Sequence, residues 1–402
     1  MRVLWIAREI PFPADSGDRI YTGQMVRAFG QAVGGVTFVG IADQQTGAAP
    51  DDPQVAWTSV PGPRHGLLRA LLSTWPLVAA VHATAAYKAR LDALFTQPWD
   101  AIVFDHYASG WALQRFLATP QGRSPQRPVI AYLAHNHEER VLRAIAANSD
   151  ASLVRRLGFW QNWFKVRAME RYMVNHVDLV TAITQEDADS FAVQRAGLRT
   201  IVLTPGYNGA VSLPRHISAS MPRHVIMVGS FQWAAKQENL RQFLRIADPV
   251  FASNNIVFDV VGSVPDALRA ELEPTLKATR LHGFVQDPGA LFDGARIALV
   301  PEAIGGGFKL KFLDYLFRRM PVATLTDAVA GLPAELRAEM IQSDTLAELA
   351  DAVVAQIDQV AYLDGLQQRA FAVAGSLFQW SDRGEGLLGA MFDQPELLIK
   401  KG

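Results

Sequence analysis

Short apolar segments alternate with amphipathic helical patterns along most of the chain, and glycine, proline or polar turn residues separate them. Four or five consecutive apolar residues suit a strand that is buried on both faces, and a helix after each such strand is typical of parallel sheets. The pattern therefore predicts an α/β fold with doubly wound sheets. In the first half, the expected strands are Val3–Ala7, Val36–Ile41, Ala101–Phe104, Val129–Leu133 and Leu179–Ile183, and the first expected helix includes Thr22–Phe29.

The alternation stops in a segment rich in turn residues and then starts again. We expect an acceptor-side Rossmann-like domain at residues 1–205, a linker at 206–222, a second Rossmann-like domain at 223–380 and a C-terminal helical segment at 381–402. Two such domains on one linker imply a cleft, with ligands beyond the carboxyl ends of the strands. In the second domain, the expected strands are Val225–Val228, Ile256–Val261, Ala298–Pro301 and Pro321–Thr324, and the expected helices are Glu238–Asp248, Pro265–Leu276 and Phe308–Arg318.

The composition and charge of the chain exclude several classes of function. The chain has no cysteine, which excludes disulfides, thiolate catalysis and cysteine-ligated metal centres and fits a reducing cytoplasm. Lys and Arg total 38 against 39 Asp and Glu, so the net charge of -1 gives no overall basic field for nucleic acid. Charged Arg8 and Glu9 end the first apolar run too early for a secretory signal, and no apolar run of about 20 residues predicts a transmembrane helix.

A glycine-rich loop stands between an expected strand and an expected helix. Glycines let the backbone approach a ligand closely, and the first amides of a helix are unpaired and partly positive, so this arrangement suits phosphate. The alternative is a tight loop before a solvated helix. The residues of the loop are Gly305, Gly306, Gly307 and Phe308.

Charged residues follow the same loop. Lys309 and Lys311 add full positive charges for a phosphate group. Asp314 lies further along the expected helix, where a carboxylate can accept hydrogen bonds from ribose hydroxyls. Together with the glycines, these residues predict a nucleotide site.

Two more glycine turns follow expected strands. In the second half, Gly229 and Ser230 end a strand, and Lys236 comes just before the next helix, from where it can reach the same cleft or lie on the surface. At the first strand–helix junction, Ser16 and Gly17 either face a diphosphate or form an ordinary surface turn. No Gly-x-Gly-x-x-Gly fingerprint follows the first strand, which argues against a standard dinucleotide-binding oxidoreductase.

Polar side chains follow two strands of the first half. They can line the acceptor side of the cleft or form only its polar rim, and His135 is suited to orienting a sugar hydroxyl. His135 and His137 also allow a metal site, but their spacing on a strand-to-helix turn need not converge on one ion, so we expect no metal. The candidate acceptor-side residues are Asp105, His106, Asn136 and Glu138.

An aromatic segment with interleaved basic residues runs from Leu157 to Tyr172. Trp160, Phe164 and Arg167 share one helical face. The pattern favours a long helix that buries its aromatic side chains in the first domain. The alternative is peripheral docking on an anionic membrane surface.

The order and spacing of these motifs resemble the GT-B glycosyltransferases, and within them the large retaining family 4, over nearly the whole length. The resemblance extends to a tryptophan near the C-terminus. The segments that carry it include Ser16-Gly17, His135-Asn136-x-Glu138, Thr204-Pro-Gly, Val228-Gly-Ser, Gly262, His282-Gly-Phe-Val, Gly307-x-x-x-Lys311-x-x-Asp314, Pro321-Val and Trp380.

The resemblance implies a nucleotide-sugar donor that is bound mainly by the second domain, with no separate cofactor. It implies that Phe284 and Val285 belong to the segment whose backbone reads the base, and that Asp314 holds the ribose. It also implies that Lys236 neutralises the diphosphate, that Gly17 approaches the phosphates and that His135 contacts the transferred sugar.

The expected reaction is metal-independent transfer of a sugar to an acceptor hydroxyl with retention of configuration. The expected acceptor is a glycan or lipid-linked molecule of bacterial surface polysaccharide or glycoconjugate synthesis, used at the cytoplasmic face of the inner membrane. The chain departs from the family pattern at Gly306, where the first acid of Glu-x7-Glu is missing, and at Ser230, where an arginine is common. These departures motivate one alternative, a binding or scaffold protein without transfer activity. A further alternative is a sugar-nucleotide epimerase on the same fold.

Overall fold

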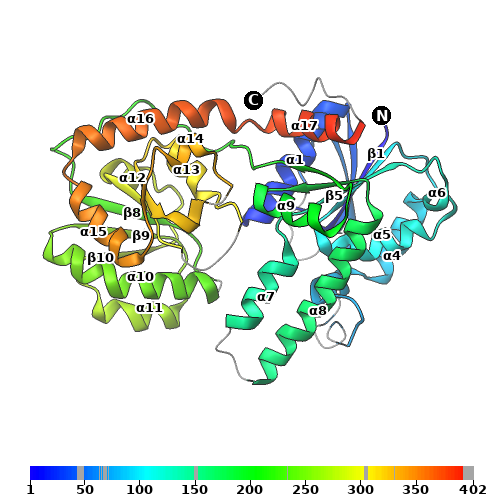
Figure 1. The fold of residues 1–402 in the computed structure, drawn as a ribbon, viewed down its shortest axis with the longest axis horizontal. Coiled ribbons are helices and arrows are strands. Elements are labelled where there is room, and N and C mark those ends of the chain that lie inside the picture. Colours follow the sequence, from blue (N-terminus) through cyan, green and yellow to red (C-terminus); the bar gives the residue numbers. More distant parts are fainter. Residues whose placement is uncertain are drawn as a thin grey trace. The chain divides into compact units, whose positions relative to one another are not determined.

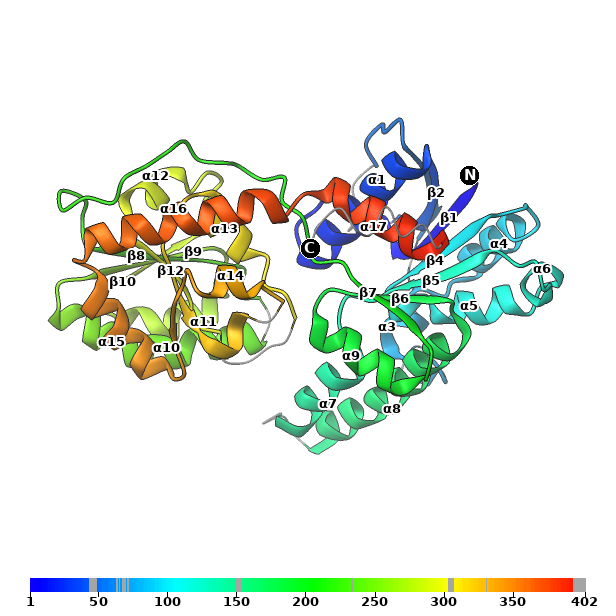
Figure 2. The same cartoon turned by 45° about the horizontal axis from the view of Figure 1, so that its top comes forward.

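The computed structural model describes residues 1–42, 49–62, 64, 66, 70, 72–148, 153–232, 234–302, 307–329 and 331–392. The chain divides into two compact units. The first consists of residues 1–206 together with the segment from Trp380 onward, and the second consists of residues 207–379. Each unit is built on one parallel sheet with helices on both faces (Figures 1 and 2).

The first unit contains a seven-stranded sheet in the order β3-β2-β1-β4-β5-β6-β7. All neighbouring strands are parallel. The strand order reverses direction between β1 and β4, which makes the sheet doubly wound. The strands are β1 Val3–Glu9, β2 Val36–Ala42, β3 Val55–Pro61, β4 Ala101–Asp105, β5 Val129–Leu133, β6 Leu179–Ala182 and β7 Arg199–Val202.

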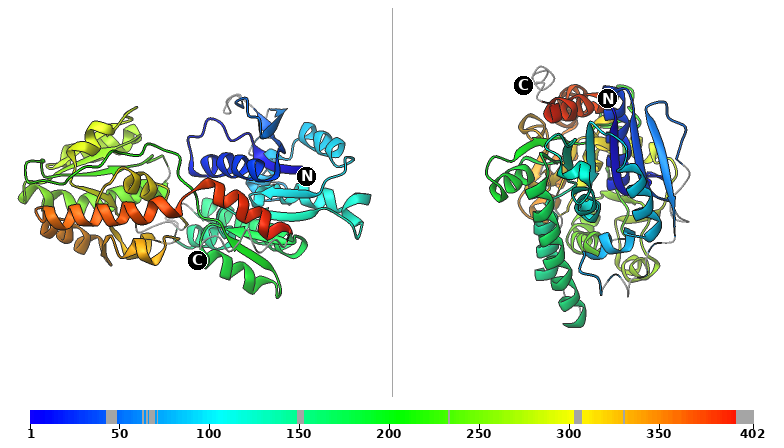
Figure 3. Two further views of the ribbon diagram at one scale, coloured as in Figure 1. Left: turned by 90° about the horizontal axis from the view of Figure 1, so that it is seen from above. Right: turned by 90° about the vertical axis from the view of Figure 1, so that its right-hand side faces the viewer.

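The first unit is completed by a helix from the far end of the chain. Helix α17 lies along α1 in all the views (Figures 1 to 3), and glycine at position 384 permits this approach, because a Cβ there would lie 2.1 Å from the carbonyl oxygen of Ala28. The helices are α1 Gly17–Val33, α3 Leu77–His82, α4 Ala85–Leu94, α5 Gly110–Leu117, α6 Pro120–Arg123, α7 Glu138–Asn148, α8 Leu153–His176, α9 Gln185–Gln194 and α17 Trp380–Phe392.

The second unit contains a six-stranded parallel sheet in the order β10-β9-β8-β11-β12-β13. Its order reverses between β8 and β11, in the same way as in the first unit. The strands are β8 His224–Val228, β9 Val257–Val261, β10 Thr279–Gly283, β11 Ile297–Val300, β12 Val322–Leu325 and β13 Ile341–Ser343. The helices are α10 Ala234–Ser253, α11 Asp266–Leu272, α12 Gly289–Gly294, α13 Lys311–Phe317, α14 Ala334–Arg337, α15 Leu346–Gln356 and α16 Val360–Leu377.

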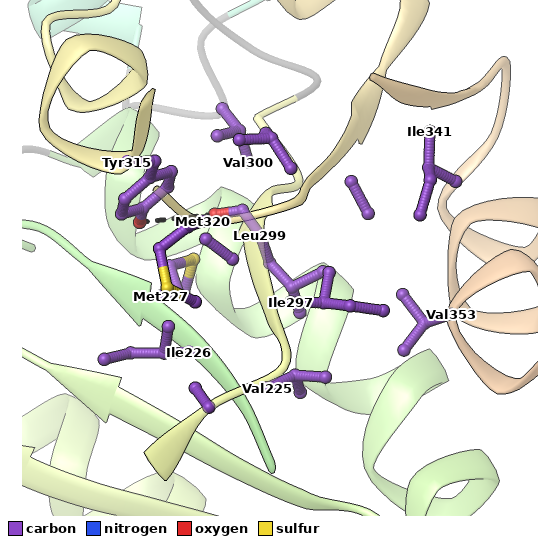
Figure 4. Packing of buried hydrophobic residues seen from close by; sticks show 14 of the residues in the cluster. Val225, Ile226, Met227, Ile297, Leu299, Val300, Tyr315, Met320, Ile341 and Val353 are labelled. Atoms are coloured by element: carbon purple, nitrogen blue, oxygen red, sulfur yellow. Dashed lines mark hydrogen bonds between the residues drawn. The ribbon is translucent and has the colours of Figure 1, made fainter. Parts of the chain in front are cut away.

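A buried tyrosine of α13 ties the two central strands of the second unit together (Figure 4). The Tyr315 hydroxyl accepts a hydrogen bond from the Val228 amide at 2.8 Å and lies 3.5 Å from the Leu299 carbonyl oxygen. The surrounding core consists of aliphatic side chains of β8, β11 and the adjoining helices. This bond fixes the end of β8, where the candidate site begins.

The α/β expectation is confirmed, and each expected strand is present with small differences at its ends. The sequence analysis missed four strands: β3, β7, β10 and β13. Each lies at the edge of a sheet, where partial exposure breaks the continuous apolar run that marks central strands. From Leu346 to Phe392 the chain is mostly helical, in α15, α16 and α17.

Three helix starts differ from the expectation by three residues or more, and one of them is α10, which begins at Ala234, four residues before Glu238. Helix α1 begins at Gly17, well before Thr22. Ser16 is the N-cap residue but makes no side-chain capping bond, and the Asp18 carboxylate lies in the positive first turn. Helix α13 begins at Lys311, after Phe308, so the residues that follow the glycine loop are not the first turn of this helix. No described helix is long and apolar enough to cross a membrane.

We predict that Gly262→Ala destabilises the protein, because Gly262 has φ +130° and an added Cβ would lie 1.7 Å from the Gly229 carbonyl oxygen. Such strain and overlap should lower the free energy of unfolding by more than about 2 kcal/mol. Urea unfolding measures the loss. Gly294→Ala is the matched control, because a Cβ there meets no atom within 4 Å. Equal midpoints for the two variants would contradict the prediction.

Candidate functional site

Where the strand order reverses in the second unit, the loops that follow two adjacent strands leave a crevice between them. Strands β8 and β11 are neighbours, and both loops leave the carboxyl end of the sheet, at Gly229 and at Pro301. In doubly wound sheets this position is the usual crevice for a ligand. The charged residues predicted from the sequence gather here.

Lys311, the first residue of α13, lies in this crevice. Its Nζ lies 3.5 Å from the position that a Cβ at Gly229 would take, so the glycine leaves room for the ammonium group. The same Nζ forms an ion pair with Glu302, and both side chains are largely buried, at 13% and 12% exposed. Glu302 was not among the sequence candidates, although it follows directly after a buried strand.

Lys309 and Lys236 lie close enough to this ion pair for the charges of Lys311 and Glu302 to shift their pKa values. Lys309 is 8% exposed, and its buried Nζ has no hydrogen-bond partner among the described residues. Lys236 lies in the first turn of α10 and is partly buried. The structure therefore brings three predicted lysines together around one carboxylate.

The pKa shifts show how these charges interact. Burial, followed by the neighbouring Lys311 charge, lowers the pKa of Lys236. Burial also lowers the pKa of Lys309, and the Glu302 carboxylate opposes this effect only in part. Burial acts to raise the pKa of Glu302, but the Lys311 ammonium outweighs it and holds that pKa below its ordinary value. The cluster thus holds excess positive charge in a poorly solvated place, which an anionic ligand would stabilise.

Three further predicted donor residues, Asp314, Phe308 and Gly307, lie on the same unit. Asp314 is exposed in α13 and accepts a hydrogen bond from the Tyr207 hydroxyl at 3.1 Å, and the Tyr207 ring stacks on Phe317 at 4.3 Å. Phe308 is partly buried, with its ring 6.0 Å from that of Phe378. Gly307 has φ +74°, which favours glycine. Gly305 and Gly306 lie outside the described residues.

The predicted base-reading loop follows β10, at the carboxyl end of the same sheet. Phe284 is 79% exposed and Val285 is partly buried. Ser230 is exposed next to Gly229. An exposed phenylalanine at this edge offers a flat apolar face to a ligand.

In the first unit, a histidine–aspartate pair lies beyond the carboxyl ends of β4 and β5. His135 Nε2 donates to Asp105 Oδ1 at 2.7 Å, and the Trp5 indole donates to the other carboxylate oxygen at 2.9 Å. Burial acts to raise the pKa of Asp105, but the His135 contact lowers it overall, so Asp105 is a carboxylate. The buried Nδ1 of His135 has no partner among the described residues.

Three more acceptor-side candidates lie beside this pair. His106 has φ +67°, and its Nε2 lies 3.7 Å from Glu138 Oε1. Burial lowers the pKa of His106 to about 4, so its imidazole is neutral at pH 7. Asn136 donates to Glu138 at 3.1 Å. Burial acts to raise the pKa of Glu138, but the His106 and Asn136 contacts outweigh it and lower that pKa.

The first unit also contains a charge network that the sequence analysis did not assign. Glu9, at the end of β1, is 7% exposed and accepts hydrogen bonds from Arg19 at 3.2 Å and Arg64 at 2.6 Å. Arg8 pairs with Asp18. The position of Arg8 and Glu9 directly after an expected buried strand could have indicated this charge network. From the sequence, the two residues were used only to exclude a secretory signal peptide.

Several of the charged and polar side chains described above line one small pocket of the first unit. Gly17 is exposed at the start of α1, and Ser16 donates to Asp18 at 2.5 Å. Among the described residues, no cluster of three or more His, Asp or Glu side chains is arranged to hold a metal ion. The pocket is lined by Ala7, Arg8, Glu9, Pro11, Asp18, Arg19, Thr22, Asp105, His106 and His135.

Comparison with known proteins finds a family model that matches part of the chain and solved structures with the same fold. Residues 222–359 match the family model described as "Glycosyl transferases group 1". No curated protein matches the sequence. Among solved structures, HepE of Anabaena in complex with UDP and glucose has a TM-score of 0.62 at 12% identity and covers 98% of this chain and 100% of its own.

Two further structures are similar over nearly their full length. WaaG, a glycosyltransferase involved in lipopolysaccharide biosynthesis, has a TM-score of 0.64 at 15% identity, with 97% of this chain and 99% of its own covered. A trehalose-6-phosphate protein from E. coli, bound with UDP-2-fluoro glucose, has a TM-score of 0.60 at 12% identity, with 97% and 99% covered. The chain therefore has the two-domain fold of the GT-B glycosyltransferases, and residues 222–359 of its second unit match the glycosyl transferases group 1 model.

Proposed function

We propose that this protein transfers a sugar from a nucleotide-diphosphate donor to an acceptor hydroxyl. The observation that carries the proposal is the convergence of Lys236, Lys309 and Lys311 on Glu302 beside Gly229. With all four side chains ionised, the cluster has a net charge of +2, which suits a diphosphate. UDP, or a UDP sugar, is the ligand named for HepE and for the E. coli protein, so UDP is the first nucleotide to test.

The chemical step breaks the bond between the sugar anomeric carbon and the diphosphate oxygen. The diphosphate leaves with the bonding electrons, and the lysines stabilise its negative charge in a site with little water. The acceptor oxygen forms the new bond, and its proton passes to the departing phosphate on the same face. We propose that the reaction is family 4-like, retains the anomeric configuration and needs no metal. We also propose that the exposed Asp314 binds the ribose.

The first unit is proposed to serve the sugar and the acceptor. His135 contacts the transferred sugar, and Asp105 holds the imidazole in place through the 2.7 Å hydrogen bond. His106, Asn136 and Glu138 offer further polar groups to acceptor hydroxyls. We propose a glycan or lipid-linked acceptor in bacterial surface polysaccharide synthesis, used by a cytoplasmic protein in peripheral contact with the membrane.

A thermal-shift screen of UDP, GDP and ADP tests donor binding. A ligand that binds only the native state raises the apparent melting temperature, and a concentration of 100 times Kd adds about 2.7 kcal/mol of stability. We expect UDP to give the largest shift. The absence of a shift with every nucleotide would overturn the proposal in favour of a scaffold without transfer, whereas turnover of the UDP sugar with no acceptor present would indicate an epimerase.

We predict that Lys311→Ala lowers kcat by a factor on the order of 10²–10³, because it removes a charge that stabilises the leaving group. Circular dichroism and the melting temperature should show an intact fold. Lys277→Ala is the control, because Lys277 is exposed and lies outside the cluster. An unchanged rate with a verified donor would remove Lys311 from the mechanism.

We also predict that UDP affinity falls as the pH rises from neutral toward the lowered pKa values of Lys236 and Lys309. Burial lowers the pKa of both Lys236 and Lys309 in the free protein, and a bound diphosphate should raise both, so binding takes up protons. Titration calorimetry in buffers of different ionisation enthalpy measures this uptake. Lys236→Arg should weaken the pH dependence, because arginine stays charged. Affinity that is constant, or that rises with pH, would contradict this account.

A further inference from the structure

The first unit has an open pocket at the edge of its sheet opposite the acceptor-side candidates. Strands β5, β6 and β7 lie side by side (Figure 2), and the pocket lies where they begin. Val129 and Arg199 are the first residues of β5 and β7, and Asp178 directly precedes β6. His135 and its neighbours follow the carboxyl ends of the strands, so the reaction proposed above does not account for this pocket.

Basic side chains dominate the lining of the pocket. They are Arg127, His176, Arg195 and Arg199, whereas Asp178 is the one acid among the described lining residues. Three arginines and one aspartate give the lining a net charge of +2 when His176 is neutral. The whole chain, in contrast, has a net charge of -1. The pocket is therefore a local basic site on a chain without an overall basic charge.

The single carboxylate of the lining is already fully engaged. Arg127 donates to both Asp178 oxygens at 2.7 Å, and the Ile130 amide donates to one of them at 2.8 Å. Such a bidentate pair is among the strongest that arginine forms with a carboxylate. Asp178 therefore matches the charge of Arg127, and the lining offers no second carboxylate for Arg195.

Arg195 and Arg199 are each anchored by a backbone carbonyl near the end of a helix. Arg195 donates to the Val177 carbonyl oxygen at 2.9 Å, just after α8, and Arg199 donates to the Ala390 carbonyl oxygen in the last turn of α17. Arg195 forms no ion pair with a described residue, and the bond to Val177 uses only one of its N–H groups. The anchored guanidinium therefore presents further donors in a rigid fork, which matches the geometry of a phosphate.

The rest of the lining and the size of the pocket suit a ligand larger than a free phosphate ion. Leu117, Val129, Val177 and Met391 add apolar side chains to the arginines. The volume of the pocket is about 600 Å³, which lies within the range of small-molecule sites. Positive charge beside apolar surface fits a small organic molecule that carries a phosphate group.

We propose that this pocket binds a phosphate monoester, with Arg195 as the main contact of the phosphate group. A phosphate monoester carries close to two negative charges at neutral pH, which match the net charge of the lining. The organic part of the ligand packs against the apolar side chains. The inference goes beyond the proposed sugar transfer and does not depend on it, because the pocket shares no residue with the lysine cluster of the second unit.

Titration calorimetry with phenyl phosphate and with inorganic phosphate tests the proposal. We expect phenyl phosphate to bind more tightly, because its ring reaches the apolar lining. Arg195→Gln should lower the affinity for both anions on the order of tenfold or more, because charge-assisted hydrogen bonds are lost. Asn175→Asp places a carboxylate in the lining without changing the size of the side chain, and it should also weaken binding. Arg280→Gln is the control, because Arg280 is exposed and belongs to the second unit.

The same titration separates the pocket from the lysine cluster, which can also attract phosphate. Lys311→Ala should keep the binding that depends on Arg195. If Lys311→Ala abolishes binding while Arg195→Gln binds normally, the anion lies at the lysine cluster and the inference is wrong. It is also wrong if the unmodified protein binds neither anion. The thermal shift with UDP should be the same in Arg195→Gln as in the unmodified protein, so a failure of UDP to bind would overturn the donor site alone.

Discussion

Parallel strands cannot be joined by tight turns. This constraint determines where the polar residues of the two candidate sites lie, one site in each unit. Each strand must return through a crossover segment, and where successive crossovers turn to opposite sides, the loops beyond two adjacent strands separate and leave a crevice. The chain does this twice, between β1 and β4 and between β8 and β11. Glu9 and Asp105 stand at the first reversal, and Gly229 and Glu302 stand at the second.

Both crevices contain charged side chains that are largely buried. The ratio of positive to negative charges differs between the two crevices. In the first unit, Glu9 is matched by arginines, and Asp105 by His135 and Trp5, so each carboxylate has its own partners. In the second unit, one carboxylate stands against three lysines, and Lys309 lacks a described partner. Unbalanced buried charge is costly to a fold, and it is commonly tolerated where a ligand supplies the opposite charge.

The central strands and the positions of most candidate residues were predictable, because a buried parallel strand leaves a continuous apolar run and the site lies in the residues that follow it. The edge strands were not predictable, because their exposed residues break the continuous apolar run. The pairing of Lys311 with Glu302 depends on where α13 begins, and this helix begins later than the sequence pattern indicated. The grouping of Arg19 and Arg64 around Glu9 joins residues from distant parts of the chain, which local patterns do not reveal.

The hairpin of α7 and α8 shows a different limit of sequence reasoning. The periodicity of the segment predicted a helix, and α8 is one. Periodicity does not show which face finds a neighbour, because that depends on α7 packing against only one side. Trp163 and Phe164 are adjacent in sequence, yet one is buried and the other is 58% exposed.

The path of the chain has a consequence for how the protein is made. The chain leaves the first unit after Gly206 and returns to it at Trp380, and these two residues lie against one another. The second unit is therefore an insertion within the first. A ribosome releases residues in order, so the second unit can fold while the first still lacks α17. The surface of α1 that packs on α17 then stays uncovered until α17 is synthesised.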